Sequence, residues 1–285
     1  MTEIIVEFLN FISGAGVLQA ASGDLLKGVA EYNPAAYEAT VAIAQTVVKP
    51  VASVILSLML VVELARNASR FDGDGQLGVK IIASTLFKFV LLIIAVQYAP
   101  QILAAMHEVN EAIIRGTSQM GSVDGSGNLN ENLGDRMRGD IERAGVLQQV
   151  GVLIVVIIPF LVSVVAVIVV KIMIALRFLE VYLLTSFAAL PVAFIAHPDT
   201  KPIAIGYLRA YGAAVIHGAT LYIGMFLCGH IIASALAEDR VGDIGGQSIM
   251  AWSVVSFLPL CLGSVLIIVM ALASGRLAKA LVGNA

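Results

Sequence analysis

The most constraining feature of the sequence is its long runs of residues without a charged side chain. Residues 150–170 are 21 consecutive uncharged residues, most of them Val, Ile or Leu. A helix of about 20 apolar residues spans the hydrocarbon core of a bilayer. Of the 285 residues, 59% are hydrophobic and 13% are charged, whereas a soluble domain is about half apolar and about a quarter charged. This excess predicts helices that face lipid.

Five long apolar segments, in which charged residues are few or absent, predict five full membrane spans. They cover residues 46–63, 81–103, 150–170, 203–236 and 248–274. A sixth apolar stretch, residues 181–196, is short and contains Pro191, which interrupts helical hydrogen bonding. The predicted fold is therefore an all-α polytopic membrane helix bundle with five full spans plus a Pro-broken hairpin, and six full spans is the alternative. A broken hairpin at membrane depth must be covered by protein or water.

The distribution of Lys and Arg favours the five-span arrangement, because cytoplasmic loops beside spans are enriched in these residues. With five spans the N-terminus lies outside and the C-terminus inside. The inner side then holds Arg66, Arg70, Lys80, Lys171, Arg177, Lys201, Arg276 and Lys279. With six spans, the basic C-terminal end would share a side with the acidic N-terminus, and the acidic residues 238–243 would be cytoplasmic.

The polar segments divide the chain into regions. Residues 1–40 are predicted to be an N-terminal extracytoplasmic segment. Its first helix, residues 2–12, is amphipathic and either lies in the membrane interface or packs on a partner subunit. The remaining regions are residues 41–106 with the first two spans, 107–146 as a polar, net-acidic extracytoplasmic loop, 147–275 as the C-terminal transmembrane bundle, and 276–285 as a short cytoplasmic tail.

The candidate intramembrane polar and ion-pair residues are Lys88, Arg177, Glu180 and Arg209. Charges at membrane depth are costly and are usually paired or functional. Arg177 and Glu180 are spaced i,i+3, so they can pair on one helix face. Two interpretations stay open: a polar lining at a translocation path, or an ion pair that fixes how the hairpin docks.

Small residues recur every four positions at Gly206, Ala210, Ala214 and Gly218. Such a stripe lets helix backbones approach closely. It predicts helix packing, either within the chain or between subunits.

The sequence shows no catalytic or metal-binding signature: no HExxH, no G-x-S-x-G and no P-loop. His217 and His230 are 13 residues apart, so on a straight helix they point to different sides. Cys228 and Cys261 both lie in apolar runs, which predicts buried thiols. We therefore predict no enzymatic activity, no cofactor and no metal site.

Two stretches of the second half have a familiar pattern. Residues 177–194 read RFLEVYLLTSFAALPVAF, and residues 206–212 read GYLRAYG. Together with residues 48–56 (VKPVASVIL) and 275–281 (GRLAKAL), they resemble the TrbL-like inner-membrane family of type IV secretion and conjugation systems, which includes the sixth VirB protein. The similar patches fall within residues 45–105 and 150–282.

The resemblance implies an integral inner-membrane channel or scaffold subunit of a conjugative DNA transfer machine. Its implied partners are other type IV secretion subunits, including a VirB-type ATPase and bitopic channel proteins, the lipid bilayer, transferred single-stranded DNA or relaxase, and further copies of itself. The net-acidic loop 107–146 argues against direct phosphate binding by that loop. The alternative is a secondary transporter with a midplane substrate site near Pro191, although such transporters usually contain internal repeats, and none is evident in this sequence.

Overall fold

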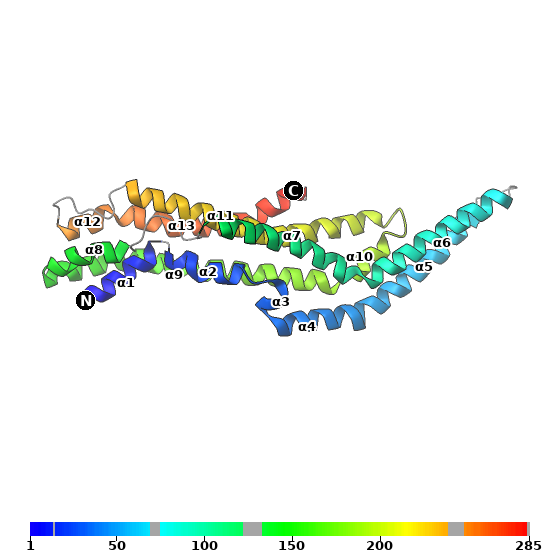
Figure 1. Ribbon diagram of the computed structural model, residues 1–285, viewed down its shortest axis with the longest axis horizontal. Helices are drawn as coiled ribbons and strands as arrows, with labels where there is room; N and C mark the ends of the chain where they lie inside the picture. The colour runs from blue at the N-terminus through cyan, green and yellow to red at the C-terminus, as the bar shows by residue number, and fades with distance from the viewer. Residues whose placement is uncertain (14, 69–74, 122–132, 239–247, 284–285) are drawn as a thin grey trace. The chain divides into compact units, whose positions relative to one another are not determined.

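The computed structural model describes all residues except 14, 69–74, 122–132, 239–247 and 284–285. The described residues form helices and no β-strand, so the predicted all-α class is confirmed. In chain order (Figure 1), the elements are α1 (Thr2–Ile12), α2 (Ala15–Leu25), α3 (Val29–Tyr32), α4 (Pro34–Ile43), the π-helical turn η1 (Ala44–Val48), α5 (Lys49–Ala68), α6 (Gly75–Gln97), α7 (Ala99–Met120), α8 (Leu133–Arg143), α9 (Val146–Ser186), α10 (Ala189–Phe194), α11 (Lys201–Glu238), α12 (Ile249–Val255) and α13 (Phe257–Leu281).

Within the described residues, five helical segments are long and apolar enough to cross a membrane. They are Pro34–Ala68, Gly78–Gln97, Val146–Ser186, Lys201–Ser234 and Ile249–Leu281. Each overlaps one of the five predicted spans, so the polytopic fold is confirmed. Thr2–Ile12 and Gly16–Leu25 pass the same test together, with a bend of 69° between them, which would raise the number to six.

α9 differs from the prediction in its length. The predicted third span and the first limb of the predicted hairpin form one helix of 41 residues. It is about 62 Å long at 1.5 Å per residue. Residues 160–190 contain neither Gly nor Pro, and the charges of Lys171, Arg177 and Glu180 do not interrupt the backbone hydrogen bonds of a helix. Charge therefore does not end α9, and the break comes only after Ser186.

The first predicted span also begins earlier than its apolar run. Asn33 caps α4 by accepting the backbone N–H of Ala36 at 3.0 Å, and Pro34 takes the first helical position. The helix widens into the π turn η1 just before Pro50, where Lys49 N–H donates to Ala44 O. Because Pro50 has no N–H for the carbonyl four residues earlier, a local widening there costs little hydrogen bonding.

The chain forms two compact units. The first contains Met1–Lys27, Asn110–Arg177 and Ile216–Ala278, and the second contains Gly28–Val109, Phe178–Val215 and Lys279–Ala285. These units group the residues differently from the regions expected along the sequence, whose extracytoplasmic and cytoplasmic placements stay predictions.

In the first unit α1 packs on α8. Ile5, Leu9 and Ile12 of α1 are buried together with Met137 and Ile141 of α8. These residues of the amphipathic helix therefore pack against its own chain, and contact of the helix with the membrane interface or with a partner subunit stays a prediction. Within the predicted loop over residues 107–146, α7 runs to Met120 and α8 covers Leu133–Arg143, whereas residues 122–132 lie outside the described residues.

Polar contacts fix the position of α1 on α8. The Asn10 side chain accepts the backbone N–H of Gly134 at 2.7 Å. A Cβ at Gly134 would overlap the carbonyl oxygen of Val6, so only glycine allows this close approach. Arg138 pairs with Glu3 at 2.6 Å, and the hydrogen bond that it donates to the Glu3 carboxylate raises the pKa of Arg138.

α1 and α2 follow the span of α9 in the first unit. Glu3 pairs with Arg138, which precedes α9 in the chain. The rings of Phe8 and Phe160 stack with centroids 4.0 Å apart, in the middle of α9's apolar run. Asp24 lies 3.5 Å from Lys171, just after that run. These contacts extend the N-terminal segment along the depth of the 150–170 span.

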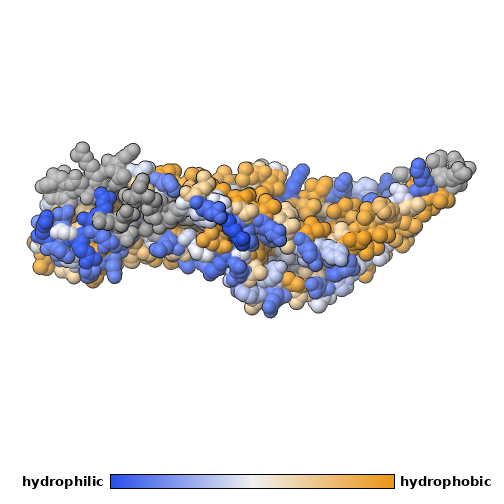
Figure 2. All heavy atoms as spheres, in the orientation of Figure 1, coloured by the Kyte–Doolittle hydropathy of each residue, from blue (hydrophilic) through white to orange (hydrophobic). Residues whose placement is uncertain are grey.

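In the second unit α10 packs against α5 and α6. Ala189 and Ala193 of α10 are buried with Ala52, Leu56 and Phe89. The outward faces of α5 and α6 are apolar: Val54, Leu58, Val61 and Phe87 have 61%, 62%, 64% and 66% of their surface exposed. Figure 2 shows hydrophobic side chains gathered over these two helices. This surface suits contact with acyl chains.

Candidate functional site

The break between α9 and α10 is the centre of the candidate site in the second unit. Pro191 has no N–H to give to the carbonyl of Phe187, four residues earlier. Leu190 N–H donates to that carbonyl at 3.1 Å instead. Phe187 and Ala188 donate to Leu184 O and Thr185 O at 3.1 and 3.2 Å, one residue closer than in an α-helix. The sequence thus ends α9 with tight turns and restarts it as α10.

Two tyrosines of α11 hold this break. Tyr207 Oη donates to Leu184 O at 2.5 Å. Tyr211 Oη lies 2.6 Å from His107 Nε2 of α7 and 3.4 Å from Thr185 Oγ1. Tyr211 is fully buried. We call Leu184, Thr185, Tyr207, Tyr211 and His107 the break network.

Further bonds extend from the break network to neighbouring segments. Tyr182 Oη donates to Val29 O at 2.7 Å, and Ser186 Oγ donates to Tyr182 O at 3.0 Å. Lys88 Nζ donates to Ala196 O at 2.6 Å, just after the end of α10. In all of these bonds a side chain satisfies a backbone carbonyl. The arrangement covers an irregular backbone, as membrane depth requires, and it fixes the geometry of the break.

In the first unit, a second set of polar residues from α7, α9 and α13 lies near His217 and Gly218 of α11. Arg177 of α9 is buried, with 3% of its surface exposed. Its guanidinium lies against Gly218, where a Cβ would overlap it. Glu111 of α7 acts on Arg177 electrostatically. Nearby, His217 Nε2 lies 2.9 Å from Ser274 Oγ of α13.

Of the predicted charged residues, Arg177 is buried and Glu180 is exposed, and their predicted pairing stays a prediction. Lys88 is mostly exposed, and its Nζ reaches the end of α10. Arg209 is exposed and lines a surface hollow with Lys201 and Gly206. Their roles in function stay predictions.

The four residues of the predicted small-residue stripe differ in how far they are buried. Gly206 is exposed, and a Cβ there would meet nothing within 4 Å. Ala210 is half-buried, and Ala214 and Gly218 are buried. Of the stripe's two glycines, Gly218 therefore provides room for a neighbouring side chain, and Gly206 does not.

Sequence reasoning missed His107 and Asn110 as structural polar residues. Asn110 Oδ1 accepts the backbone N–H of Ala219 at 3.0 Å, in a fully buried contact. Both residues lie on α7, in a part of the sequence that is polar overall. Nothing in the sequence pattern therefore indicates that these two side chains point into the protein. Tyr207 and Tyr211 did carry a signal, since they lie four residues apart within the familiar 206–212 pattern.

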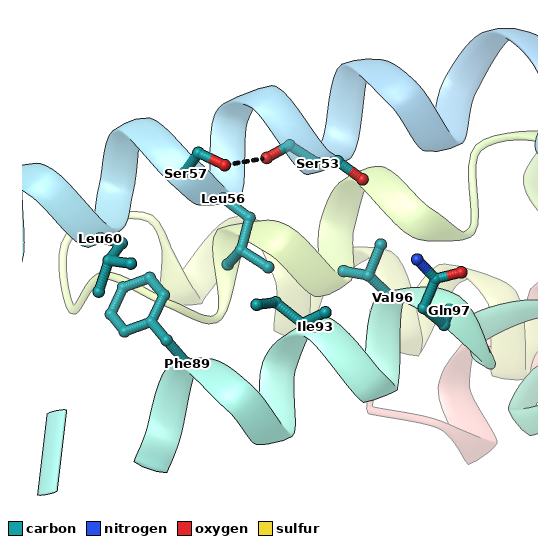
Figure 3. A pocket seen from close by; sticks show the side chains of 8 residues that line it. All are labelled: Ser53, Leu56, Ser57, Leu60, Phe89, Ile93, Val96 and Gln97. Carbon is teal, nitrogen blue, oxygen red and sulfur yellow. Dashed lines mark hydrogen bonds between the residues drawn. The ribbon is translucent and has the colours of Figure 1, made fainter. Parts of the chain in front are cut away.

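A shallow groove of about 170 Å³ lies between α5 and α6 in the second unit. Its walls are Leu56, Leu60, Phe89, Ile93 and Val96, and Figure 3 shows them turned toward one another between the two helices. The serines of the groove, Ser53 and Ser57, donate to their own helix at Lys49 O and Ser53 O, both at 2.9 Å. Gln97 adds a polar side chain to the lining. The walls are otherwise mainly apolar and suit an acyl chain.

Comparison with known proteins gives one match. A family model described as TrbL/VirB6 plasmid conjugal transfer like protein matches residues 17–189, which is more than half of the chain. The matched region includes α4 to α9 and the break after Ser186. No curated protein and no solved structure matches the chain.

Proposed function

Because the chain belongs to the TrbL/VirB6-like family of plasmid conjugal transfer proteins, we propose that it is an integral inner-membrane channel or scaffold subunit of a type IV secretion machine. The family makes it a component of a conjugation system, and its apolar helices make it a multi-pass membrane protein. The channel or scaffold role and the inner membrane are the proposed steps beyond that.

The observation that carries the proposal is the family match over residues 17–189. Two features of the structure support a scaffold role. Tyr207 of the break network and Lys88 beside it donate to the backbone carbonyls of Leu184 and Ala196, so these carbonyls of an irregular segment are already hydrogen-bonded. The groove between α5 and α6 has apolar walls and serines that are bonded to their own helix. These groups hold a fixed shape in a bilayer and do not resemble a catalytic pair.

The partners follow from this role. A subunit without its own chemistry takes energy from an ATPase of the same machine, here a VirB-type ATPase. It assembles with bitopic channel proteins and with further copies of itself, and it lies beside the path of the transferred single-stranded DNA or its relaxase. By the distribution of basic residues, the N-terminus is outside and the C-terminus inside.

Deletion of the gene from the conjugative element that carries it tests the proposal. We expect DNA transfer to recipient cells to be lost, while replication of the element and synthesis of its ATPase continue. A copy supplied in trans should restore transfer. Unchanged transfer in the deletion strain would contradict the proposal. Saturable uptake of a small solute by the purified chain in vesicles would favour a secondary transporter instead.

A further inference from the structure

A surface hollow of about 470 Å³ lies at the start of α11, within the second unit. The residues that line it are Pro198, Lys201, Pro202, Ile205, Gly206 and Arg209. Lys201 and Arg209, the two charged residues of the lining, are both basic and both exposed. A Cβ at Gly206 would meet nothing within 4 Å, which leaves the space between their positions open. We call this space the basic hollow.

The two positive charges of the basic hollow are not neutralised by nearby carboxylates. Among the residues that the structure describes, neither Lys201 nor Arg209 takes part in an ion pair. The acidic residue closest to Lys201 along the chain is Asp199, and its carboxylate lies 3.5 Å from His197 Nδ1. The basic hollow therefore attracts an anion.

The backbone at this end of α11 has little to donate to such an anion. The N–H groups of Lys201 and Ile203 already donate to His197 O and Thr200 O, both at 3.0 Å. Pro202, which lies between them, has no N–H. An anion in the basic hollow is therefore bound by the two basic side chains and not by the end of the helix.

The sequence of α11 relates the basic hollow to the depth of the bilayer. α11 is a candidate membrane span from Lys201 onward. Residues 210–237 contain no Asp, Glu, Lys or Arg over 28 positions, which in a helix is about 42 Å and more than the hydrocarbon core. A span that uses this run for the core leaves Arg209 at the level of the lipid headgroups. The Cβ bonds of a helix tilt toward its N-terminus, so the Arg209 side chain begins in the direction of Lys201.

The surface beside the basic hollow is apolar. Ile203, Ile205 and Leu208 have 56%, 39% and 37% of their surface exposed. Such a surface suits acyl chains, and a charge beside them is costly unless it meets an opposite charge. The six lining residues include no aromatic ring on which a base of single-stranded DNA could stack. These surroundings favour a lipid over a nucleic acid as the source of the anion.

We propose that the basic hollow binds the phosphate headgroup of an anionic phospholipid, whose acyl chains lie along Ile205 and Leu208. The Arg209 guanidinium can donate two parallel hydrogen bonds to a phosphate, and the Lys201 ammonium adds a point charge. Basic pockets beside membrane spans bind anionic headgroups in this way. A zwitterionic headgroup fits less well, because its own cation is repelled. The inference goes beyond the proposed function and does not depend on it.

Lipid binding to the purified full chain in mild detergent tests this. Native mass spectrometry measures the affinity for phosphatidylglycerol and for zwitterionic phosphatidylcholine. One variant combines Lys201→Gln with Arg209→Gln, and a second, Gly206→Leu, fills the basic hollow without a change of charge. The matched control combines Arg276→Gln with Lys279→Gln, which removes two basic side chains of α13 outside the hollow. Circular dichroism shows that each variant folds.

We expect the parent chain to bind phosphatidylglycerol at least about tenfold more tightly than phosphatidylcholine. Both hollow variants should lose at least about tenfold in affinity for phosphatidylglycerol, and the control should stay within about twofold of the parent. An equal loss in the control would overturn the inference, because net charge alone would then explain the binding. Equal affinity of the parent for the two lipids would overturn it as well.

Competition distinguishes the lipid from other sources of phosphate. Inorganic phosphate or a short single-stranded oligonucleotide, added at the concentration of the lipid, should leave phosphatidylglycerol bound. Displacement by inorganic phosphate would assign the basic hollow to a soluble phosphate, and displacement by the oligonucleotide would assign it to DNA. Either displacement contradicts the proposal. Because none of these measurements involves DNA transfer, the gene deletion still judges the proposed function separately.

Discussion

At the scale of single residues, the missing side chain of Gly218 allows the guanidinium of Arg177 to lie directly against the backbone of α11. The Arg177 side chain lies where a Cβ of residue 218 would be. Arg177 is buried, so its long side chain has little space into which it can move. A methyl group in such a place forces side chains out of their preferred rotamers.

Gly218→Ala should therefore destabilise the protein by about 1–3 kcal/mol, the usual cost of overpacking. The matched control is Gly206→Ala in the same helix, where a Cβ meets nothing within 4 Å. That change should be neutral or stabilise by up to about 1 kcal/mol through helix propensity. Unfolding in detergent, followed by circular dichroism, measures both. Equal stability of the two variants would show that Arg177 moves aside without cost.

The charge of Glu111 on α7 acts on buried Arg177, and Glu111 also pairs with Arg115 at 3.1 Å. Glu180, three residues after Arg177, is exposed. Removing a charge that compensates a buried ion is costly, since the ion stays in a low-dielectric site.

Glu111→Gln should consequently destabilise the protein by about 1–3 kcal/mol, below the cost of breaking a fully buried pair because Glu111 is partly exposed. Glu180→Gln removes the same charge from an exposed position and should change stability by less than about 0.5 kcal/mol. The same unfolding experiment, with membrane abundance as a second readout, compares the two. A larger effect at Glu180 would restore the i,i+3 pair as the important one.

At the scale of elements, the break after Ser186 is built by Pro191 and held by α11. Without proline, residue 191 gains an N–H that reaches Phe187 O, and α9 can continue into α10. The tyrosines that bond to the break would then face a regular helix. The bond from Tyr207 to Leu184 O would compete with a helical hydrogen bond to the same carbonyl.

Pro191→Ala should therefore lower DNA transfer at least about tenfold, the effect of about 1.4 kcal/mol on assembly of the correct geometry. Pro159→Ala is the control, because Pro159 lies inside α9, where the helix continues regardless. That variant should transfer DNA within about twofold of the parent, or within about 0.4 kcal/mol. Mating assays measure both, with immunoblots for membrane abundance. Normal transfer by Pro191→Ala would mean that the break has no functional role.

At the scale of the whole molecule, the contacts of the N-terminus bear on how often the chain crosses the membrane. α1 and α2 follow α9 from Glu3 beside Arg138 to Asp24 beside Lys171. If the 150–170 span crosses, α1 and α2 cross with it. Two further crossings, Pro34–Ala68 and Gly78–Gln97, then return the chain to the side of Asp24. In that arrangement the chain must cross once more between Gln97 and Leu133 to reach the side of α8.

The five-span arrangement and the arrangement with these additional crossings both place the two chain ends on opposite sides of the membrane. They differ in the side on which Leu26 lies. The five-span arrangement expects Leu26 outside, whereas the contact between Asp24 and Lys171 favours the inside. In a chain whose own cysteines are replaced by alanine, single cysteines at Arg136, Leu26 and Ala280, which are all exposed, can be probed with an impermeant maleimide. We expect labelling from outside at position 136 and only after permeabilisation at 26 and 280. Labelling of 26 together with 136 would restore the extracytoplasmic placement of residues 1–40.

The sequence by itself determined the helical class and the five apolar segments, because transfer of long uncharged runs into lipid outweighs every local preference. It also located Pro191 as a break, since proline acts on its own backbone. It misjudged where elements end: the charges after residue 170 suggested a boundary, yet α9 continues to Ser186. The polar composition of residues 107–146 likewise concealed two helices.

Only the tertiary structure decided which polar residues meet. Arg177 and Gly218 are 41 positions apart in the sequence, and His107 and Tyr211 are 104 apart. Spacing along one helix suggested Arg177 with Glu180, because i,i+3 neighbours are all that a single helix can reveal. Packing between helices places Arg177 against α11 and within reach of the charge of Glu111. The rotation of each helix about its axis, which packing sets, determines these partners.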